Sequence, residues 1–110
     1  MMKAVLILEN GEISLVDKKF DLAELQKTVG GYIQDVPLSD GLSVIVNEEG
    51  RLVGSEPNQM ATTLASAELD KDNRYLFGGG LVGPALFIGV DGEDYCDVPR
   101  WFVDAVHVGE

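Results

Sequence analysis

Two short apolar segments near the N-terminus flank a dipeptide that strongly favours a tight turn. The first reads AVLIL and the second EISLV, with Asn10 and Gly11 between them. Asn-Gly is the preferred centre of a type I′ hairpin turn, because both central residues need a positive φ. In the second segment, Ile13 and Leu15 fall on one face at the period of a strand. The sequence therefore predicts an antiparallel β-hairpin over residues 3–16.

The clearest helix signal is DLAELQKTVGG, residues 21–31. Asp21 is a good N-cap residue, and Glu24 three positions later completes a pattern similar to a capping box. Gly30 is suited to end the helix, because glycine adopts the left-handed conformation without a Cβ clash. Apolar residues recur on one face at helical spacing: Leu22, Leu25 and Val29.

Gly31 is not needed for that cap, since one left-handed residue is enough. One interpretation is a sharp reversal that leads directly into a strand at YIQDV, residues 32–36. The other interpretation is that another segment or a ligand approaches the backbone closely at this position. We prefer the first, because glycine at the junction of two elements usually serves the turn.

The middle of the chain predicts one more hairpin and one more helix. Residues 40–54 read as the hairpin, with NEEG as the turn, Gly50 supplying the positive φ and RLVG as the return strand. Residues 55–69 read as the helix, with Ser55 as its N-cap and Pro57 in its first turn. The polar segment DKDNR that follows predicts a loop.

The last third of the chain predicts a buried strand and a short helix. PALFIGV, residues 84–90, is apolar enough for a strand in the core, and VDGED after it predicts a turn. DVPRWFVDAV, residues 97–106, predicts a terminal helix capped by Asp97. Its apolar residues are expected to dock on the sheet: Trp101, Phe102 and Ala105.

These elements predict an α+β fold, a mostly antiparallel sheet built from hairpins with two or three helices packed on it. A chain of 110 residues that is 45% hydrophobic fits a single compact domain over residues 1–110. Its apolar runs fall well short of the roughly 20 residues that cross a bilayer, and the first stops at Glu9, too early for a signal peptide. Cys96 is the only cysteine, which fits a reducing compartment, so we expect a cytoplasmic protein without membrane contact.

Acidic residues dominate the charge. Nineteen Asp and Glu against eight Lys and Arg give a net charge of −11 at pH 7. We expect no direct nucleic acid binding, because a phosphate backbone requires clustered Lys and Arg. The acids fit three interpretations: solubility, a salt-rich cytoplasm, or a surface for a basic partner, DNA mimicry included. Their dispersal along the chain weighs against strict mimicry of DNA.

Residues that carry catalytic chemistry are sparse. His107 is the only histidine, and with Cys96 it supplies too few ligands for a closed zinc site. DGEDYCD, residues 91–97, has four carboxylates but lacks the spacing of an EF-hand. GGGLVGPA, residues 78–85, is not followed by the Lys-Ser/Thr of a phosphate-binding loop. We therefore expect no enzyme activity, no metal and no cofactor.

Three segments resemble one known family in their order and separation: LQKTVGGYIQ, VNEEGRLVGSEPNQMAT and GLVGPALFIG. They are similar to domain-of-unknown-function family 3846, small proteins found largely in phages, plasmids and other mobile elements. The resemblance spans roughly residues 20–90 and implies no established activity that carries over to this chain. Its recurrent positions correspond here to Gly30, Gly31, Tyr32, Asn47, Glu48, Gly50, Asn58, Ala61, Thr62, Gly83 and Gly89.

Two function hypotheses follow, ahead of an enzyme of unrecognised type. The first is a non-enzymatic accessory protein of a phage or mobile element that binds and inhibits a host protein, such as a defence factor, through its acidic surface. The alternative is a protein that binds or sequesters a small molecule, nucleotide-like ligands included. A closed pocket would favour the ligand, and an acidic face with an apolar centre would favour the protein partner. Under both hypotheses the candidate binding residues are Gly31, Tyr32, Asn47, Glu48, Asn58 and Thr62.

Overall fold

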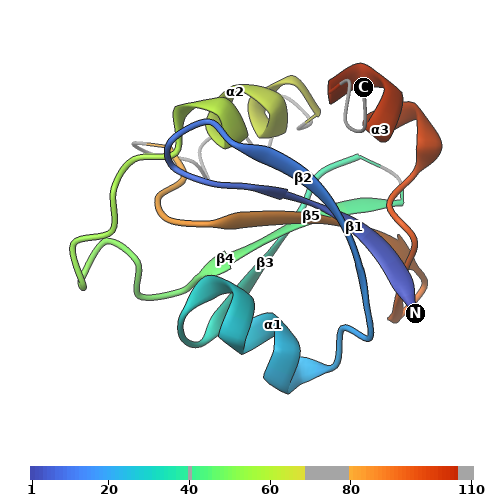
Figure 1. The fold of residues 1–110 in the computed structure, drawn as a ribbon, viewed down its shortest axis with the longest axis horizontal. Helices are drawn as coiled ribbons and strands as arrows, with labels where there is room; N and C mark the ends of the chain where they lie inside the picture. The colour runs from blue at the N-terminus through green and yellow to red at the C-terminus, as the bar shows by residue number, and fades with distance from the viewer. Residues whose placement is uncertain (40, 69–79, 107–110) are drawn as a thin grey trace.

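The computed structural model describes residues 1–39, 41–68 and 80–106, and Figure 1 shows their arrangement. They form the predicted α+β fold, a six-stranded antiparallel sheet with three helices packed on it. The strands are β1 (Met2–Ile7), β2 (Ile13–Lys18), β3 (Ile33–Pro37), β4 (Leu42–Asn47), β5 (Ala85–Asp91) and β6 (Asp94–Cys96). The helices are α1 (Leu22–Val29), α2 (Gln59–Glu68) and α3 (Arg100–Val106).

The sheet has the strand order β2-β1-β5-β4-β3, and β6 pairs with the far end of β5. β1 pairs with the first half of β5, where Val5 lies opposite Phe87, and β6 pairs with the second half, where Cys96 lies opposite Gly89. The predicted apolar strand is therefore the central strand of the sheet. Its continuous apolar sequence is explained by helices on both faces.

The helices divide between the two faces of the sheet, with α1 on one face and α2 and α3 on the other (Figure 1). Leu25 of α1 packs in one core cluster with Ile45 and Leu86. Phe102 of α3 packs in the other with Phe87, the two rings stacked with centroids 4.8 Å apart. Successive side chains of β4 and β5 thus supply the two cores alternately.

The first hairpin is confirmed, but its turn differs from the predicted type I′ turn. Gly11 N–H donates to the carbonyl of Leu8 at 2.9 Å, which places Glu9 and Asn10 at the centre of the turn. Gly11 follows with φ 89°, and Asn10 Oδ1 accepts from Glu12 N–H at 2.9 Å. This is the three-residue loop in which glycine takes the left-handed position after the turn.

The second hairpin, predicted over residues 40–54, is wrong in one part: RLVG, residues 51–54, does not form the return strand. β4 turns back on β3, with Val36 opposite Val44, and residues 48–54 form a series of turns instead of a strand at RLVG. The physical reason is that β3 and β5 already pair with the two edges of β4. A further strand from RLVG has no free edge of β4 to pair with.

The predicted helix over residues 55–69 begins four residues later, at Gln59. Pro57 pairs with Val82 in an isolated bridge, so Ser55 cannot serve as the cap. Asn58 takes that position, because its Oδ1 accepts from Ala61 N–H at 3.1 Å. The loop predicted at DKDNR lies outside the described residues.

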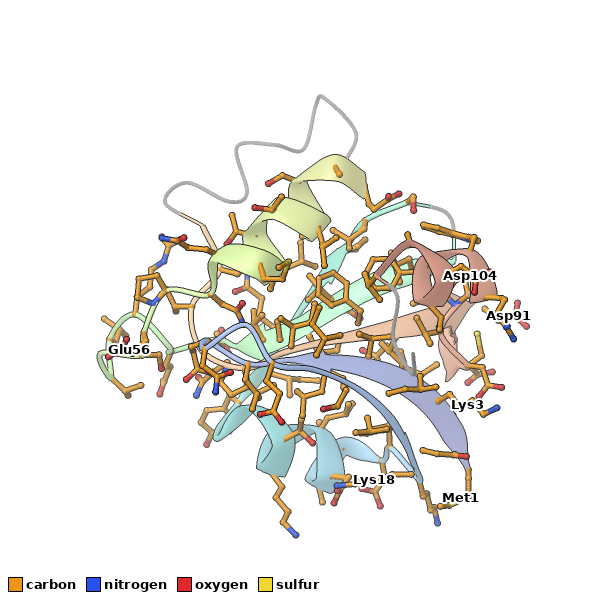
Figure 2. The ribbon with its side chains drawn as sticks, turned by 45° about the horizontal axis from the view of Figure 1, so that its top comes forward. Met1, Lys3, Lys18, Glu56, Asp91 and Asp104 are labelled. Carbon is orange, nitrogen blue, oxygen red and sulfur yellow. The ribbon has the colours of Figure 1, made fainter. Side chains whose placement is uncertain are left out.

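The terminal helix docks through fewer residues than predicted. Phe102 is buried, whereas Trp101 and Ala105 lie on the exposed side of α3. Asp97 does not cap the helix but accepts at Oδ1 from Lys3 N–H at 2.8 Å, which joins the segment before α3 to β1. Charged side chains such as Lys18, Asp91 and Asp104 point outward (Figure 2). Within the described residues, no helix is long and apolar enough to cross a membrane.

Candidate functional site

The two glycines after α1 have different structural roles. Gly30 has φ 85° and ends the helix, as predicted, and both it and Gly31 donate from N–H to the carbonyl of Gln26, at 2.8 and 3.0 Å. Gly31 does not have a positive φ. A Cβ at that position would lie 3.0 Å from Asn47 Nδ2, so a side chain of a neighbouring strand, rather than its backbone, occupies the space.

Asn47 connects the end of α1 to the loop that follows β4. Its Nδ2 donates to the carbonyl of Val29 at 3.3 Å, and its Oδ1 accepts from Glu49 N–H at 2.8 Å. The missing side chain of Gly31 leaves room for this amide. The second interpretation of Gly31, a close approach by another segment or a ligand, is thus met by the Asn47 side chain, which also fixes the loop of residues 48–54 relative to α1.

Asn58 is fully buried and offers no surface for a partner. Its Nδ2 donates to the carbonyls of Ile7 at 2.9 Å and Gly83 at 2.8 Å. Thr62 is partly buried, and its Oγ1 donates to the carbonyl of Asn58 and accepts from Leu81 N–H, both at 2.8 Å. These two candidate residues are therefore engaged in holding α2 to β1 and to the segment before β5.

The other candidates gather at one end of the sheet, around two neighbouring hollows. The first, which we call the junction hollow, has a volume of about 250 Å³ and is lined by Gln26, Gly30, Gly31, Tyr32, Asn47, Glu49 and Val53. The second, the edge cavity, has about 280 Å³ and is lined by Gln34, Val36, Val46, Asn47, Glu48, Arg51, Leu52, Gly80, Leu81 and Val82. Asn47 lies between them, whereas Asn58 lines neither hollow.

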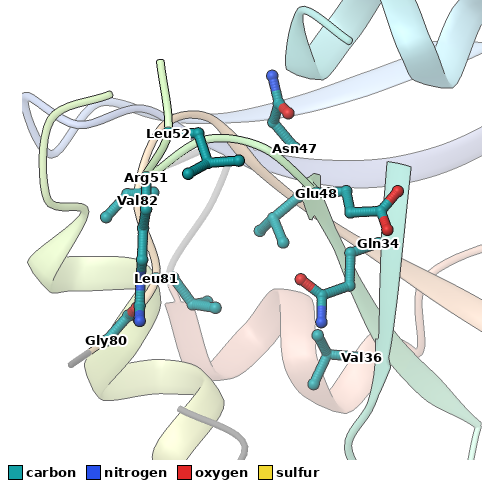
Figure 3. Close-up of a pocket in the computed structure, with 10 residues that line it drawn as sticks. Gln34, Val36, Asn47, Glu48, Arg51, Leu52, Gly80, Leu81 and Val82 are labelled. Carbon is teal, nitrogen blue, oxygen red and sulfur yellow. The ribbon is translucent and has the colours of Figure 1, made fainter. Parts of the chain in front are cut away.

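Figure 3 shows the edge cavity between two walls. Gln34 and Val36 project from β3 on one side, and Arg51 and Leu81 lie on the other. The Arg51 guanidinium donates to the carbonyl of Gly80, which holds the loop of residues 48–54 against the segment before β5. The wall of the cavity is thus apolar at Val36 and Leu81 and polar at Gln34 and Arg51.

Three large apolar side chains surround these hollows and remain exposed. Leu52 is 86% exposed, and Tyr32 and Val53 are each 65% exposed. Tyr32 and Val53 line the junction hollow, Leu52 lines the edge cavity, and we call the three the apolar patch. Exposed apolar side chains that adjoin one another mark interaction surfaces more often than isolated ones do.

Sequence reasoning missed Leu52 and Val53 because it assigned them to a strand. An available signal was the pair of glycines around them, Gly50 and Gly54, since a segment of only three residues between two glycines suits a turn better than a strand. Gln34 and Arg51 gave no signal of their own. Their positions depend on the pairing of β3 with β4 and on the return of the chain before β5.

The reactive groups of the described residues lie elsewhere. Burial raises the pKa of the Cys96 thiol, with further contributions from the charges of Asp91 and Asp97. A raised pKa lowers the thiolate fraction, which is unfavourable for a nucleophile. His107 lies outside the described residues. Among residues 1–39, 41–68 and 80–106, no cluster of three or more His, Cys, Asp or Glu side chains is arranged to hold a metal ion.

Comparison with known proteins identifies the family. The family model described as Domain of unknown function (DUF3846) matches residues 2–107. The chain belongs to this family. Comparison with curated proteins and with solved structures found no match. The family match extends well beyond residues 20–90, so the N-terminal hairpin and α3 are also part of the DUF3846 domain.

Proposed function

We propose that this DUF3846 protein is a non-enzymatic accessory protein of a phage or other mobile element, which acts in the cytoplasm and binds and inhibits a host protein. The family resemblance suggests the origin, and the surface described above suggests the mode of action. A factor of host defence is the kind of target that fits such an origin. The proposal requires a protein-binding surface, and the apolar patch is the observation that carries it.

The apolar patch has the composition of a small interaction surface. Leu52 and Val53 lie at the tip of a loop, and the exposed Glu48 and Glu49 precede them in the same loop. Protein interfaces combine an apolar centre with a polar rim, and tyrosine is enriched among residues that contribute most to binding. The architectural bonds of Asn47 fix this loop, so little ordering is required on binding.

The acidic charge suits a basic partner. With a net charge of −11, the chain attracts a positively charged surface over a distance set by salt. Complementary charge mainly accelerates association and excludes partners of the same sign. In this proposal, the acids guide the encounter and the apolar patch supplies the contact that persists.

Capture of partners from a host lysate tests the proposal, with the chain itself as bait. Leu52→Ser should weaken capture of the partner by about tenfold or more, because full burial of a leucine contributes about 1.5–3 kcal/mol. Leu22→Ser is the matched control, since Leu22 is also exposed but lies on α1, outside the apolar patch. The captured protein should lose activity when the wild-type chain is added.

Raising the salt concentration should slow association with the captured protein. A partner that is captured equally by wild type and Leu52→Ser, or that keeps its activity in the complex, would contradict the proposal.

The second candidate function is binding of a small molecule in the edge cavity. The observation that favours it is the mixed lining of Val36 and Leu81 with the polar Gln34 and Arg51. At about 280 Å³ the cavity is at the lower limit of typical ligand sites, which have roughly 300–1,000 Å³. Native mass spectrometry of the purified chain tests this alternative, because a sequestered ligand would add a constant mass that unfolding removes.

A further inference from the structure

β3 is an end strand of the sheet, and its hydrogen-bonding pattern shows which backbone groups face outward. In the described residues it pairs only with β4. Glu48 N–H donates to the carbonyl of Tyr32 at 2.8 Å, and Leu38 N–H donates to the carbonyl of Leu42 at 3.0 Å. In an antiparallel pair, hydrogen-bonded residues alternate with residues whose backbone groups face away. Gln34 and Val36 therefore face β4.

Ile33 and Asp35 consequently direct their N–H and carbonyl groups away from β4, together with the carbonyl of Pro37. Such unpaired groups form a template on which an extended segment adds a strand. Pro37 has no N–H, which limits pairing at the C-terminal end of β3. The accessible stretch is thus centred on Ile33 and Asp35.

The two faces of β3 have different chemical character. Val36 belongs to the core cluster under α2 and α3, and with Gln34 it lines the edge cavity. Ile33 packs with the core under α1, and Asp35 shares that face two residues later. A strand added along β3 would direct every second side chain toward the edge cavity and the others toward the carboxylate of Asp35.

We propose that β3 binds an extended segment of the partner protein in which apolar and basic residues alternate. The apolar residues enter the edge cavity against Val36 and Leu81, and the basic residues lie on the face of Asp35. This inference rests on the proposed function, because it names the chemistry by which the partner is recognised. The apolar patch then adjoins the added strand through Leu52, which lines the same cavity.

Charge distinguishes this partner from a second copy of the chain. Two copies paired through β3 would bring together two molecules of net charge −11 each, and their mutual repulsion disfavours association. The carboxylate of Asp35 lies within the accessible stretch and accepts one hydrogen bond, from the Tyr95 hydroxyl. Glu48 lines the edge cavity together with Arg51, whose guanidinium donates to the carbonyl of Gly80. A basic segment complements these groups.

A synthetic peptide tests the inference directly. The probe is a capped seven-residue peptide in which leucine and lysine alternate, titrated into ¹⁵N-labelled protein. We expect shifts of the amide resonances of Ile33 and Asp35 and slower hydrogen exchange at both. A peptide of the same composition with its leucines and lysines in separate blocks should bind about tenfold more weakly. Methylation of alternate peptide nitrogens on the pairing edge should abolish the slower exchange, because the strand can no longer donate.

Two isosteric variants separate a specific contact from general attraction to an acidic protein. Asp35→Asn removes a charge on β3 and should weaken binding up to about fivefold at low salt. Asp17→Asn removes one on β2, the strand at the opposite edge of the sheet, and should leave binding unchanged. Equal binding of both peptides, equal effects of both variants, absence of binding, or shifts located away from β3 would overturn the inference.

The outcomes also separate this inference from the proposed function. A captured host protein that depends on Leu52 but is unaffected when the alternating peptide is present would uphold the proposed function and overturn pairing along β3. Pairing of the peptide with β3, without any host protein whose capture depends on Leu52, would support the inference while contradicting the proposed function.

Discussion

Asn58 reaches across the sheet end to Ile7, and its side-chain Nδ2 lies 2.9 Å from the Ile7 carbonyl oxygen. The same Nδ2 also donates to the carbonyl of Gly83 at 2.8 Å. The Oδ1 of Asn58 accepts from Ala61 N–H and so caps the N-terminus of α2. One fully buried side chain thus satisfies three backbone groups from three separate segments. A buried carbonyl or N–H without a partner is costly, so Asn58 links β1, α2 and the segment before β5.

Asn58→Ala should therefore be strongly destabilising. The variant removes two side-chain hydrogen bonds to backbone carbonyls in the protein interior and the helix cap, and we expect a loss of at least about 2 kcal/mol in the free energy of unfolding. Urea unfolding followed by circular dichroism measures the change. Asn10→Ala is the control, because the Asn10 side chain makes an equivalent bond to Glu12 N–H in an exposed turn. Similar losses in the two variants would contradict the linking role of Asn58.

Asn58→Asp gives this linkage a pH dependence. The introduced carboxyl keeps an acceptor for the helix cap, but it has no N–H to donate and its charge faces two carbonyl oxygens. Burial and these oxygens disfavour the ionised form, so its pKa in the folded state should rise. The variant should be least stable at neutral pH and recover stability as the pH falls through that raised pKa. Urea midpoints at several pH values, compared with wild type, test this result.

The sequence predicted the elements whose signals are local. Asp21 accepts from Glu24 N–H at 2.9 Å and Gly30 has the left-handed conformation, because caps depend on neighbouring residues. The predicted return strand at RLVG was wrong for a non-local reason. The edge of β4 that does not face β3 is paired with β5, which comes from far along the chain. The sequence likewise placed Tyr32, Asn47 and Glu48 in one candidate surface, but it could not show that Asn58 is buried among β1 and α2.

Gly30 and Gly31 should respond differently to alanine. In Gly30→Ala the added methyl group has open space around it, but the residue must keep φ 85°. The strain of this left-handed conformation should lower the free energy of unfolding by about 1–2 kcal/mol. Gly31→Ala has no such strain but must displace the Asn47 amide, 3.0 Å from the new Cβ. The cost of Gly31→Ala should therefore shrink in an Asn47→Ala background, whereas that of Gly30→Ala should not. Double-mutant cycles by urea unfolding measure both; additive effects at Gly31 would contradict the coupling.

Gly89 is the position where a side chain should be least tolerated. A Cβ there would lie 2.8 Å from the carbonyl carbon of Asp97, closer still to its oxygen, and 2.9 Å from Cys96 Sγ. Because the obstruction is backbone, Gly89→Ala should separate β6 from β5 and cost more than about 4 kcal/mol. Gly92→Ala, with φ 64° and nothing within 4 Å, is the control and should cost about 1–2 kcal/mol. Thermal unfolding compares them, and a smaller loss at Gly89 than at Gly92 would refute the close approach.

Tyr95 and Asp35 form a hydrogen bond between two strands that do not pair with each other. The Tyr95 hydroxyl donates to Asp35 Oδ2 at 2.6 Å. Burial raises the pKa of Tyr95 above its ordinary value, and the hydrogen bond and the charge of Asp35 raise it further. Asp35→Asn should therefore lower the pKa of Tyr95 without returning it to the ordinary value, because burial remains. Titration of the Tyr95 ring resonances by NMR measures the shift.

The same relationship fixes the direction of a stability change with pH. The pKa of Tyr95 is higher in the folded state than in the unfolded state, where it is about 10. The protonated hydroxyl therefore contributes fully to folding stability below the unfolded-state pKa, and this contribution is lost as the pH rises through the folded-state pKa. Wild type should thus lose stability above pH about 10 more steeply than Tyr95→Phe, which cannot ionise. The urea midpoints of wild type and Tyr95→Phe, measured below and above that pH, compare the two losses of stability. Parallel curves for the two proteins would show that the hydroxyl of Tyr95 does not couple ionisation to folding.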